Sequence, residues 1–422
     1  MITITDKEKC CGCEACTQIC PKKCISFIED EEGFCYPEVD ESTCIDCGLC
    51  EKVCPVLNQW DEDVPETVVA AINEDEKVRF NSSSGGIFTL LGEKVIESGG
   101  VVFSAKFDEN WNVAVAYTES LDGLQAFRGS KYLQARIDKS YKDCKCFLES
   151  GRRVLFTGTP CQIAGLLHYL RKPYSNLLAV EVLCYGVPSP LVWKTYLTEI
   201  RGMVSRLLEH DNFINRWRLL SKFHFRCSKR NDKIVMTSPA SRNTYMRLFQ
   251  KGLTIRPSCF SCPAKAGKSC ADISLGDFWG IEDANTSMDD NKGVSMVILH
   301  TDKGRSFFDS LNVKRQDVCY NDISSHNKAY FSSATHNPER ECFFKRLKQT
   351  GSVRRAASRF FHETLRRRMS DMKTLIRDFM KKDRKVIETL ENSSKDSPSK
   401  ISFRHKERGW RNYDVRIEFP LN

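Results

Sequence analysis

The chain has 422 residues, of which 41% are hydrophobic and 28% are charged, as is usual for a globular protein with two or three domains. Its first residues, MITITDKEKC, have neither a basic start nor an apolar h-region, and no apolar run reaches the length of a membrane span. We therefore expect neither export nor membrane insertion, and we predict a cytoplasmic location.

The net charge of +9 is concentrated in one segment of the chain. Between Phe343 and Lys385 there are fifteen Lys or Arg residues against four Asp or Glu residues, so the rest of the chain carries a charge of about −2. The basic character therefore says little about what the remainder of the protein binds.

The chain contains 21 cysteines, an odd number, and most of them cluster at metal-ligand spacings. A disulfide-stapled exported protein is the weaker interpretation, because no signal peptide accompanies the cysteines. We expect a reducing and anaerobic cytoplasm, since oxygen destroys exposed iron–sulfur clusters.

Residues 1–60 form the first predicted domain, with two cysteine runs, CCGCEACTQICP and CIDCGLCEKVCP. Both runs follow the spacing C-x2-C-x2-C-x3-C-P of bacterial two-cluster ferredoxins, in which the fourth cysteine of each run binds the other cluster. Three thiolates at this spacing wrap one face of a cubane while backbone amides turn toward its sulfides. One [4Fe–4S] cluster is expected on Cys10, Cys13, Cys16 and Cys54, and a second on Cys44, Cys47, Cys50 and Cys20.

Zinc is the main alternative for these runs. A structural zinc ion needs four ligands, usually as two separated pairs, and gains nothing from three evenly spaced cysteines. Cys11, Cys24 and Cys35 lie outside the pattern, and we expect them to be small buried residues.

Residues 65–342 alternate short β-rich runs, such as GGVVFSAKF and RRVLFTGTP, with helical patterns, which predicts an α/β body. Cys161 and Cys184 follow two of the apolar runs, and Cys259 and Cys262 form a C-x2-C pair. From spacing alone these four residues are compatible with a third cluster, with a zinc site, or with ordinary core cysteines.

Residues 343–391 have apolar residues at helical spacing, separated mostly by Arg and Lys, and predict a basic amphipathic helix. The helix either packs on the body with a solvated basic face or docks to a membrane surface or a partner protein. Nucleic acid is not expected as a partner, because no recognised binding module accompanies the basic residues. Residues 392–422 read as a flexible linker, NSSKDSPSK, followed by a β-rich tail.

Several motifs occur along the body in a familiar order, namely SSSGGIFTLL, RGSKYLQ, VLFTGTPCQIAGL, CYGVPSP, TIRPSCFSC and DISLGDFWG. With them the chain resembles, over roughly residues 1–345, the beta-subunit family of coenzyme F420 hydrogenases and dehydrogenases, including the ferredoxin module that many members carry. The resemblance implies a flavoprotein with FAD and one cluster of its own that feeds the flavin. By position it implies that Cys161, Cys184, Cys259 and Cys262 bind this third [4Fe–4S] cluster. Cys270 is then a spare or a substitute ligand.

The resemblance also implies three flavin-contacting segments. They consist of Ser83, Ser84, Gly85 and Gly86, of Gly129, Ser130 and Lys131, and of Gly158, Thr159 and Pro160. Glycine allows backbone amides to approach a pyrophosphate, while Ser and Lys add hydrogen-bond donors and charge. No G-x-G-x-x-G motif follows a strand, so a Rossmann dinucleotide site is not indicated.

One family segment, of the type Phe-Arg-x-Lys-x-x-Gly-Trp, is missing from its usual place before the C-x2-C pair. A similar sequence, FRHKERGW, occurs at residues 403–410. We interpret the tail as a displaced or duplicated copy that folds back near the site.

The expected fold is therefore α+β, with a small two-cluster ferredoxin-like domain, a larger α/β flavin-binding body, and a C-terminal basic helix with a short β-rich tail. The expected function is that of an iron–sulfur flavoprotein oxidoreductase, whose electrons enter singly at the ferredoxin clusters and leave as a pair to a small-molecule acceptor, or flow in reverse. Its expected partner is a ferredoxin or another redox protein. The alternatives are a non-catalytic electron-transfer subunit that docks to an enzyme, and a membrane-surface oxidoreductase. No proton donor is assigned, and the eight histidines are expected to be structural.

Overall fold

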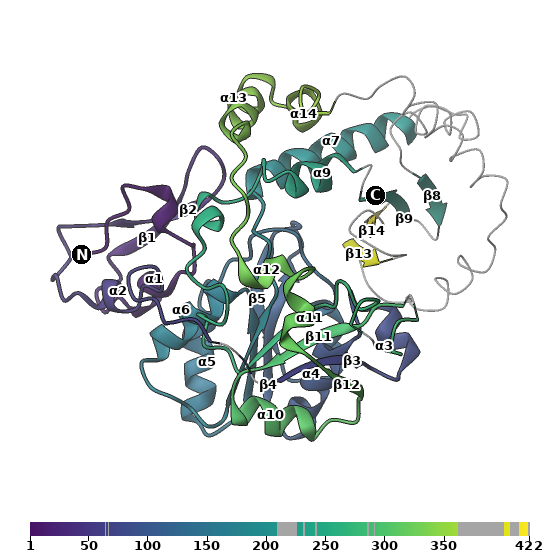
Figure 1. Ribbon diagram of the computed structural model, residues 1–422. Coiled ribbons are helices and arrows are strands. Elements are labelled where there is room, and N and C mark those ends of the chain that lie inside the picture. The colour runs from purple at the N-terminus through teal and green to yellow at the C-terminus, as the bar shows by residue number, and fades with distance from the viewer. Residues whose placement is uncertain are drawn as a thin grey trace. The chain divides into compact units, whose positions relative to one another are not determined.

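The computed structural model describes residues 1–63, 65, 67–208, 226–230, 233–240, 243–284, 287–290, 292–361, 401–405 and 413–420 (Figure 1). The chain divides into two compact units. The first contains Met1–Trp193, Thr254–Pro338 and His405–Gly409, and the second contains Lys194–Leu253, Glu339–Arg404 and Trp410–Asn422.

The cysteine-rich module at the start of the first unit has little regular structure. Its elements are η1 (Lys7–Lys9), α1 (Ala15–Ile19), β1 (Ile25–Glu29), β2 (Cys35–Val39) and α2 (Leu49–Lys52). Strands β1 and β2 form an antiparallel hairpin in which Ile25 lies opposite Val39. The buried core of the module consists of Ile2 and Ile25 together with cysteine side chains, so the cysteines replace the apolar residues of an ordinary core.

The rest of the first unit is built on an eight-stranded sheet with the order β12-β3-β11-β10-β7-β6-β4-β5. The strands are β3 (Thr67–Ile72), β4 (Val101–Phe107), β5 (Val113–Thr118), β6 (Val154–Gly158), β7 (Leu177–Val182), β10 (Ile273–Asp277), β11 (Ser295–Leu299) and β12 (Lys314–Val318). The four central strands β10, β7, β6 and β4 are parallel, and antiparallel strands flank them on both sides.

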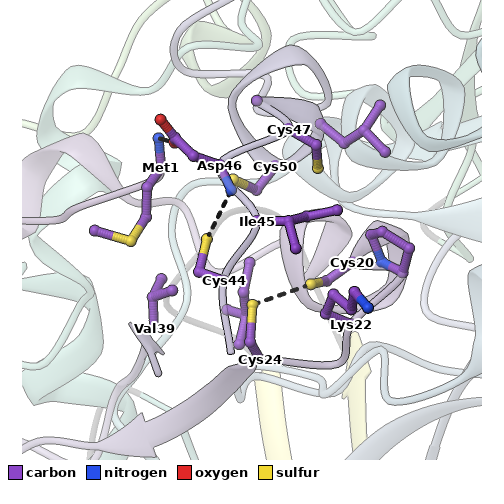
Figure 2. A pocket seen from close by; sticks show the side chains of 14 residues that line it. Met1, Cys20, Lys22, Cys24, Val39, Cys44, Ile45, Asp46, Cys47 and Cys50 are labelled. Carbon is purple, nitrogen blue, oxygen red and sulfur yellow. Dashed lines mark hydrogen bonds and ion pairs between the residues drawn. The ribbon is translucent and has the colours of Figure 1, made fainter. Parts of the chain in front are cut away.

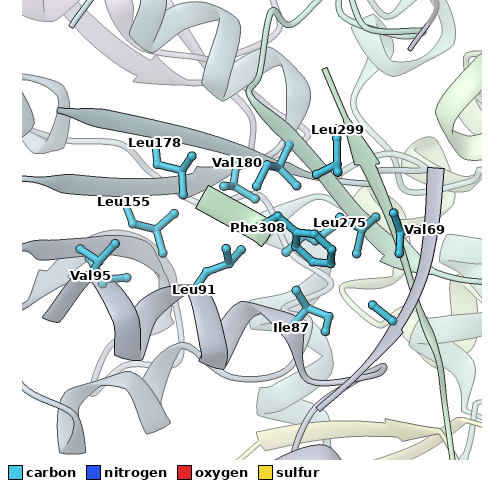
Figure 3. Close-up of a cluster of buried hydrophobic side chains, with 14 of the residues drawn as sticks. Val69, Ile87, Leu91, Val95, Leu155, Leu178, Val180, Leu275, Leu299 and Phe308 are labelled. Carbon is cyan, nitrogen blue, oxygen red and sulfur yellow. The ribbon is translucent and has the colours of Figure 1, made fainter. Parts of the chain in front are cut away.

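Helices cover both faces of this sheet (Figure 1). They are α3 (Glu76–Phe80), α4 (Ile87–Glu97), η2 (Asp122–Phe127), α5 (Ser140–Glu149), α6 (Pro160–Leu170), η4 (Pro257–Ser261), α10 (Asp302–Asp309), α11 (Tyr320–Ser324) and α12 (Lys328–Phe331). Alternate residues of β3 point to opposite faces. Val69 packs with Leu91 of α4 and Phe308 of α10 (Figure 3), whereas Val68 packs with Tyr330 of α12.

The pairing directions place five carboxyl ends at one edge of the sheet. Strands β4, β6, β7 and β10 are parallel, and β3 runs in the same direction as β10 because both pair antiparallel with β11. In open α/β sheets, ligands bind in the crevice outside the carboxyl ends of the strands. We call this side of the sheet the carboxyl edge.

The second unit contains the remaining elements. They are most of α7 (Pro190–Leu208), followed by β8 (Arg226–Arg230), β9 (Lys233–Pro239), α9 (Thr244–Gln250), α13 (Arg340–Thr350), α14 (Val353–Ala357), β13 (Ile401–His405) and β14 (Tyr413–Pro420). Its sheet has the order β13-β14-β9-β8, and β14 and β9 pair antiparallel. Tyr196 and Tyr245 stack with ring centroids 5.5 Å apart in its core.

The α+β class, the small ferredoxin-like domain and the large α/β body are confirmed. The expected continuous helix over residues 343–391 is interrupted in its described part. Helix α13 ends at Thr350, where Gly351 takes the left-handed conformation with φ of 59°, and α14 begins at Val353. Glycine stops helices in this way because it has no Cβ to oppose a positive φ. Residues 362–391 lie outside the described part of the chain.

The strand pair expected in the tail is present as β13 and β14. Most of the FRHKERGW segment lies outside the described residues, so its return to the site remains a prediction.

Packing of α4 on the sheet should be essential to the stability of the first unit. Leu91→Ala should lower the free energy of unfolding by about 2–5 kcal/mol, because the side chain is fully buried and leaves a cavity. Leu121→Ala serves as the matched control, since Leu121 is 47% exposed. Thermal unfolding followed by circular dichroism measures both variants. Equal losses in the two would contradict the packing described.

Candidate functional site

The two cysteine runs have the same backbone conformation at equivalent positions. Gly12 and Asp46 have φ values of 71° and 47°, and Glu14 and Gly48 have φ values of 59° and 67°. Left-handed residues between the cysteines turn the chain back on itself, so that successive thiols face inward. The repeated motif of the sequence is thus a repeated loop in the structure.

The first predicted ligand set comes together at the base of α1. Burial raises the pKa of Cys16, and the neighbouring thiols of Cys10 and Cys54 raise it further. Cys13 interacts in the same way with Cys16 and Cys54. The fourth cysteine of the second run therefore lies with the first three of the first run, as the ferredoxin pattern predicts.

The second predicted set lines a shallow pocket that is partly open to solvent (Figure 2). Its cysteines are Cys20, Cys44, Cys47, Cys50 and Cys24. Backbone amides point at two of the sulfurs: Asp46 N donates to Cys44 Sγ and Ile2 N donates to Cys50 Sγ, both at 3.4 Å. The pocket and the inward amides fit a group with thiolate ligands.

Cys24 is the residue of this pocket that the sequence did not indicate. It is buried as expected, but its Sγ lies 3.4 Å from Cys20 Sγ (Figure 2). Cys24 falls four residues after the run ends, so no ligand spacing pointed to it.

The third predicted set comes from three separate segments. Cys161 follows β6 at the start of α6, where Thr159 and Gln162 form a capping box. Cys184 follows β7, and the C-x2-C pair lies in and just after η4. Because β6 and β7 are parallel neighbours, the first two cysteines emerge at the carboxyl edge of the sheet.

These four cysteines are half-buried and come together. Each of the four interacts electrostatically with the other three; they are Cys161, Cys184, Cys259 and Cys262. Burial and these neighbours raise the pKa of Cys259 to about 12 and that of Cys262 to about 11, while the nearby Lys265 opposes the rise at Cys262. Such thiols lose their protons more readily when a positive centre compensates them, as the iron atoms of a cluster would.

Within the described part of the chain, no three His, Cys, Asp or Glu side chains converge as ligands on a single metal ion. The ligands of a [4Fe–4S] cluster each bind a different iron atom, so their sulfurs surround a volume and do not meet at one point.

Cys11 lies between two of the predicted ligand sets. Its buried thiol is hydrogen-bonded to both Cys13 and Cys161. The sequence predicted only a small buried residue at this position. The side chain in fact joins the ferredoxin-like module to the carboxyl edge of the sheet.

The buried carboxylate of Glu14 attaches the module to the body. Its Oε1 accepts hydrogen bonds from Arg136 Nε at 2.8 Å and Ile137 N at 3.1 Å, and its Oε2 accepts one from Asp138 N at 3.0 Å. Charge-assisted bonds of this kind are about twice as strong as neutral ones. They hold the first cysteine run against the loop that precedes α5.

Two of the predicted flavin segments meet at the carboxyl edge. Ser130 Oγ donates to Ser83 Oγ at 3.3 Å. A Cβ on Gly85 would lie 2.3 Å from Ala71 O, so the loop after β3 needs glycine there. Gly86 has φ of 84° and precedes the first residue of α4. Lys131 Nζ donates to Phe127 O at 2.7 Å, and burial lowers the pKa of this lysine to about 7.

The segment 129–135 runs along this edge toward the third predicted flavin segment. Gln134 N donates to Pro188 O at 3.4 Å, and Gln162 Nε2 donates to Ala135 O at 3.1 Å. Gln162 also accepts a hydrogen bond from Thr159 N at 3.0 Å. Among the described residues, no hydrogen bond joins the Ser83 loop directly to the Gly158 turn. The segment 129–135 links the two instead.

A hydrogen-bonded chain that runs from the exposed Asp63 to the buried Glu181 was also not predicted from the sequence. Asp63 Oδ2 is 2.7 Å from His300 Nδ1, His300 Nε2 is 2.7 Å from Ser274 Oγ, and Ser274 Oγ donates to Glu181 Oε1 at 2.5 Å. Burial raises the pKa of Glu181. His300 was expected to be structural, and residues this far apart in sequence carry no motif that would join them.

Replacement of Glu181 should change how stability depends on pH. Folding raises the pKa of Glu181 above 4.5, so the folded protein keeps a proton on this carboxyl at pH values at which the unfolded chain has lost it. The resulting contribution to the free energy of unfolding is fully present below pH 4.5 and is lost as pH rises, at about 1.4 kcal/mol for each unit by which the pKa is raised. Glu181→Gln should therefore gain stability relative to the native chain as pH rises.

The measurement is the midpoint of thermal unfolding from about pH 5 to about pH 8. Glu97→Gln, at an exposed position, should leave the pH profile unchanged. A parallel profile for Glu181→Gln would show that Glu181 does not hold its proton on folding.

Two family models match the chain. Residues 151–324 match the C-terminal domain of the beta subunit of coenzyme F420 hydrogenase/dehydrogenase, and residues 9–58 match a 4Fe-4S dicluster domain. No curated protein matches the chain. Among solved structures, the chain is similar to a chain of the xenon-derivatised F420-reducing nickel–iron hydrogenase complex from Methanosarcina barkeri, with 16% identity, a TM-score of 0.41, and coverage of 64% of this chain and 88% of that one.

The sequence resemblance is thus confirmed. No described helix is long and apolar enough to cross a membrane. With its cysteine-rich module and the part of its α/β body from residue 151 to 324 matched, the chain is an iron–sulfur protein of the oxidoreductase kind, in which a 4Fe-4S dicluster domain precedes a region similar to the C-terminal domain of the beta subunit of coenzyme F420 hydrogenase/dehydrogenase.

Proposed function

We propose that the protein is an iron–sulfur flavoenzyme in which three [4Fe–4S] clusters connect a one-electron donor protein to a flavin and a small two-electron acceptor. The observation that carries the proposal is the third cysteine set. Four half-buried cysteines from three segments come together at the carboxyl edge, where each interacts electrostatically with the other three. The same edge carries the predicted flavin segments.

The ligand sets form a continuous route through the first unit. Cys16 of the first set interacts electrostatically with Cys50 of the second. Cys13 of the first set is joined through Cys11 to Cys161 of the third. Cysteine side chains that interact electrostatically with their neighbours thus extend from the ferredoxin-like module to the sheet.

Electrons enter at the second set in this proposal. Cys47 is exposed, and Ile45, which lines the same pocket, is 56% exposed. Leu57, close behind the second run, is 61% exposed. Apolar residues around a solvent-facing cluster provide a docking surface for a ferredoxin or another redox protein.

The chain offers FAD a site built from glycine turns and hydroxyl groups. Ser83 and Ser130 place their hydroxyls together, and a Cβ on Gly129 would meet no other atom, so its backbone is open to a ligand. The start of α4, an 11-residue helix, adds free amides and a positive dipole end beside Gly86. Bound there, a flavin supplies the exchange between one-electron and two-electron transfer.

The composition of protein purified without oxygen tests this function. Iron, acid-labile sulfide and FAD are measured on one sample, and about twelve iron atoms with one FAD per chain are expected. A result of about eight iron atoms without flavin would show that the ferredoxin-like module carries its clusters but that the body is not a flavin-dependent catalyst. The protein would then be a non-catalytic subunit that docks to a partner enzyme.

Substitution of one ligand distinguishes the third set from its neighbours. Cys161→Ser should lose about four iron atoms per chain and keep the rest, because only the third cluster depends on that thiol. Cys11→Ser is the matched control: it is buried and hydrogen-bonded to Cys161, but it should keep all the iron. Loss of iron from Cys11→Ser with retention in Cys161→Ser would show that Cys11, and not Cys161, is the ligand.

A further inference from the structure

Arg256 has a fully buried side chain, with 0% of its surface exposed, at the junction of the ferredoxin-like module and the body. It lies three residues before Cys259, and its backbone precedes η4. The guanidinium reaches across to the first cysteine run, where its Nε donates to Cys10 O at 2.7 Å. One side chain thus connects the loop of the third ligand set with the loop of the first.

Every nitrogen of this guanidinium has a partner. Nη1 donates to Gln134 Oε1 at 3.1 Å, and Nη2 donates to Cys35 O at 3.0 Å and to Cys10 Sγ at 3.5 Å. The group also lies over the ring of Tyr36, 4.3 Å from its centroid. Gly12 is required beside it, since a Cβ there would lie 2.9 Å from Nη1. These contacts therefore fix the position of the Arg256 guanidinium.

The charge of Arg256 has no carboxylate partner. Among the described residues it forms no ion pair with Asp or Glu, although burial of an uncompensated cation costs several kcal/mol. The groups that interact with its charge include Cys10, Cys11, Cys161 and Cys259, together with Tyr36 and Cys35. Cys10 is a predicted ligand of the first cluster, and Cys161 and Cys259 are predicted ligands of the third, so most of the groups that face this charge are cysteine sulfurs.

We infer that Arg256 is a positioning residue for electron transfer, which fixes the first cluster against the third and raises the reduction potentials of both. This inference rests on the proposed function. Reduction adds one negative charge to a cluster, so a buried cation beside its ligands stabilises the reduced state. The hydrogen bond to Cys10 Sγ acts in the same direction, because it withdraws charge from the sulfur.

Redox titration of the full-length, anaerobically purified protein tests this inference, with the clusters followed by electron paramagnetic resonance. Arg256→Gln should lower the reduced-to-oxidised ratio of two clusters by about tenfold at the native midpoint, which equals about 59 mV for a one-electron couple. The remaining cluster, which Arg256 does not contact, should keep its midpoint. Arg256→Lys keeps the charge without the fork of donors and should give a smaller shift.

Arg152→Gln is the matched control in the same unit. Arg152 lies before β6, at the end of the strand opposite Cys161, and is paired with the carboxylate of Glu119, so its neutralisation should leave all midpoints unchanged. Iron content, measured on each variant, separates a shift in potential from loss of a cluster. If Arg256→Gln loses iron, the midpoints of Arg256→Lys test the inference in its place.

Full iron with unchanged midpoints in Arg256→Gln would overturn the inference, as would equal shifts in Arg152→Gln. A native protein with about eight iron atoms would instead refute the proposed third cluster. In that case a single shifted midpoint, that of the first cluster, would still establish the effect of Arg256 on Cys10.

Discussion

Thiolate sulfurs that are buried side by side repel one another, and this repulsion is the constraint on which the rest of the structure depends. Burial and neighbouring thiols raise the pKa of Cys16, Cys184 and Cys259, so positive charge must enter with the cluster or be supplied by the chain. The chain supplies it sparingly, through backbone amides in the module and through Lys265 and Arg256 at the body. Cluster binding and folding are therefore expected to be coupled.

The sheet determines where this chemistry takes place. Parallel strands β6 and β7 deliver Cys161 and Cys184 to one edge, and β3 brings the Ser83 loop to the same side. The segment 129–135 then runs along that edge and contacts both the Ser83 loop and the α6 cap. A relay of single electrons and a flavin need to be close together, and the carboxyl edge brings the candidate residues for both to one region.

Attachment of the module to the body uses charges of opposite sign. Glu14, a residue of the module, accepts three hydrogen bonds from the body, while Arg256, a residue of the body, donates to the module. Both side chains are almost fully buried, so neither group can leave its partners without a large cost in desolvation. The junction thereby limits the motion of the two ligand sets relative to each other, which a relay requires.

The ferredoxin pattern, the α/β body and the family were readable from the sequence, because each depends on local spacing or on ordered motifs. The convergence of the third cysteine set, the positions of Cys11 and Cys24, and the chain from Asp63 to Glu181 were decided only by tertiary structure. Spacing constrains residues within one loop, whereas contacts between loops follow from strand order and from the packing of side chains. For that reason the sequence by itself determined what kind of clusters this protein binds, and the fold determined what lies between them.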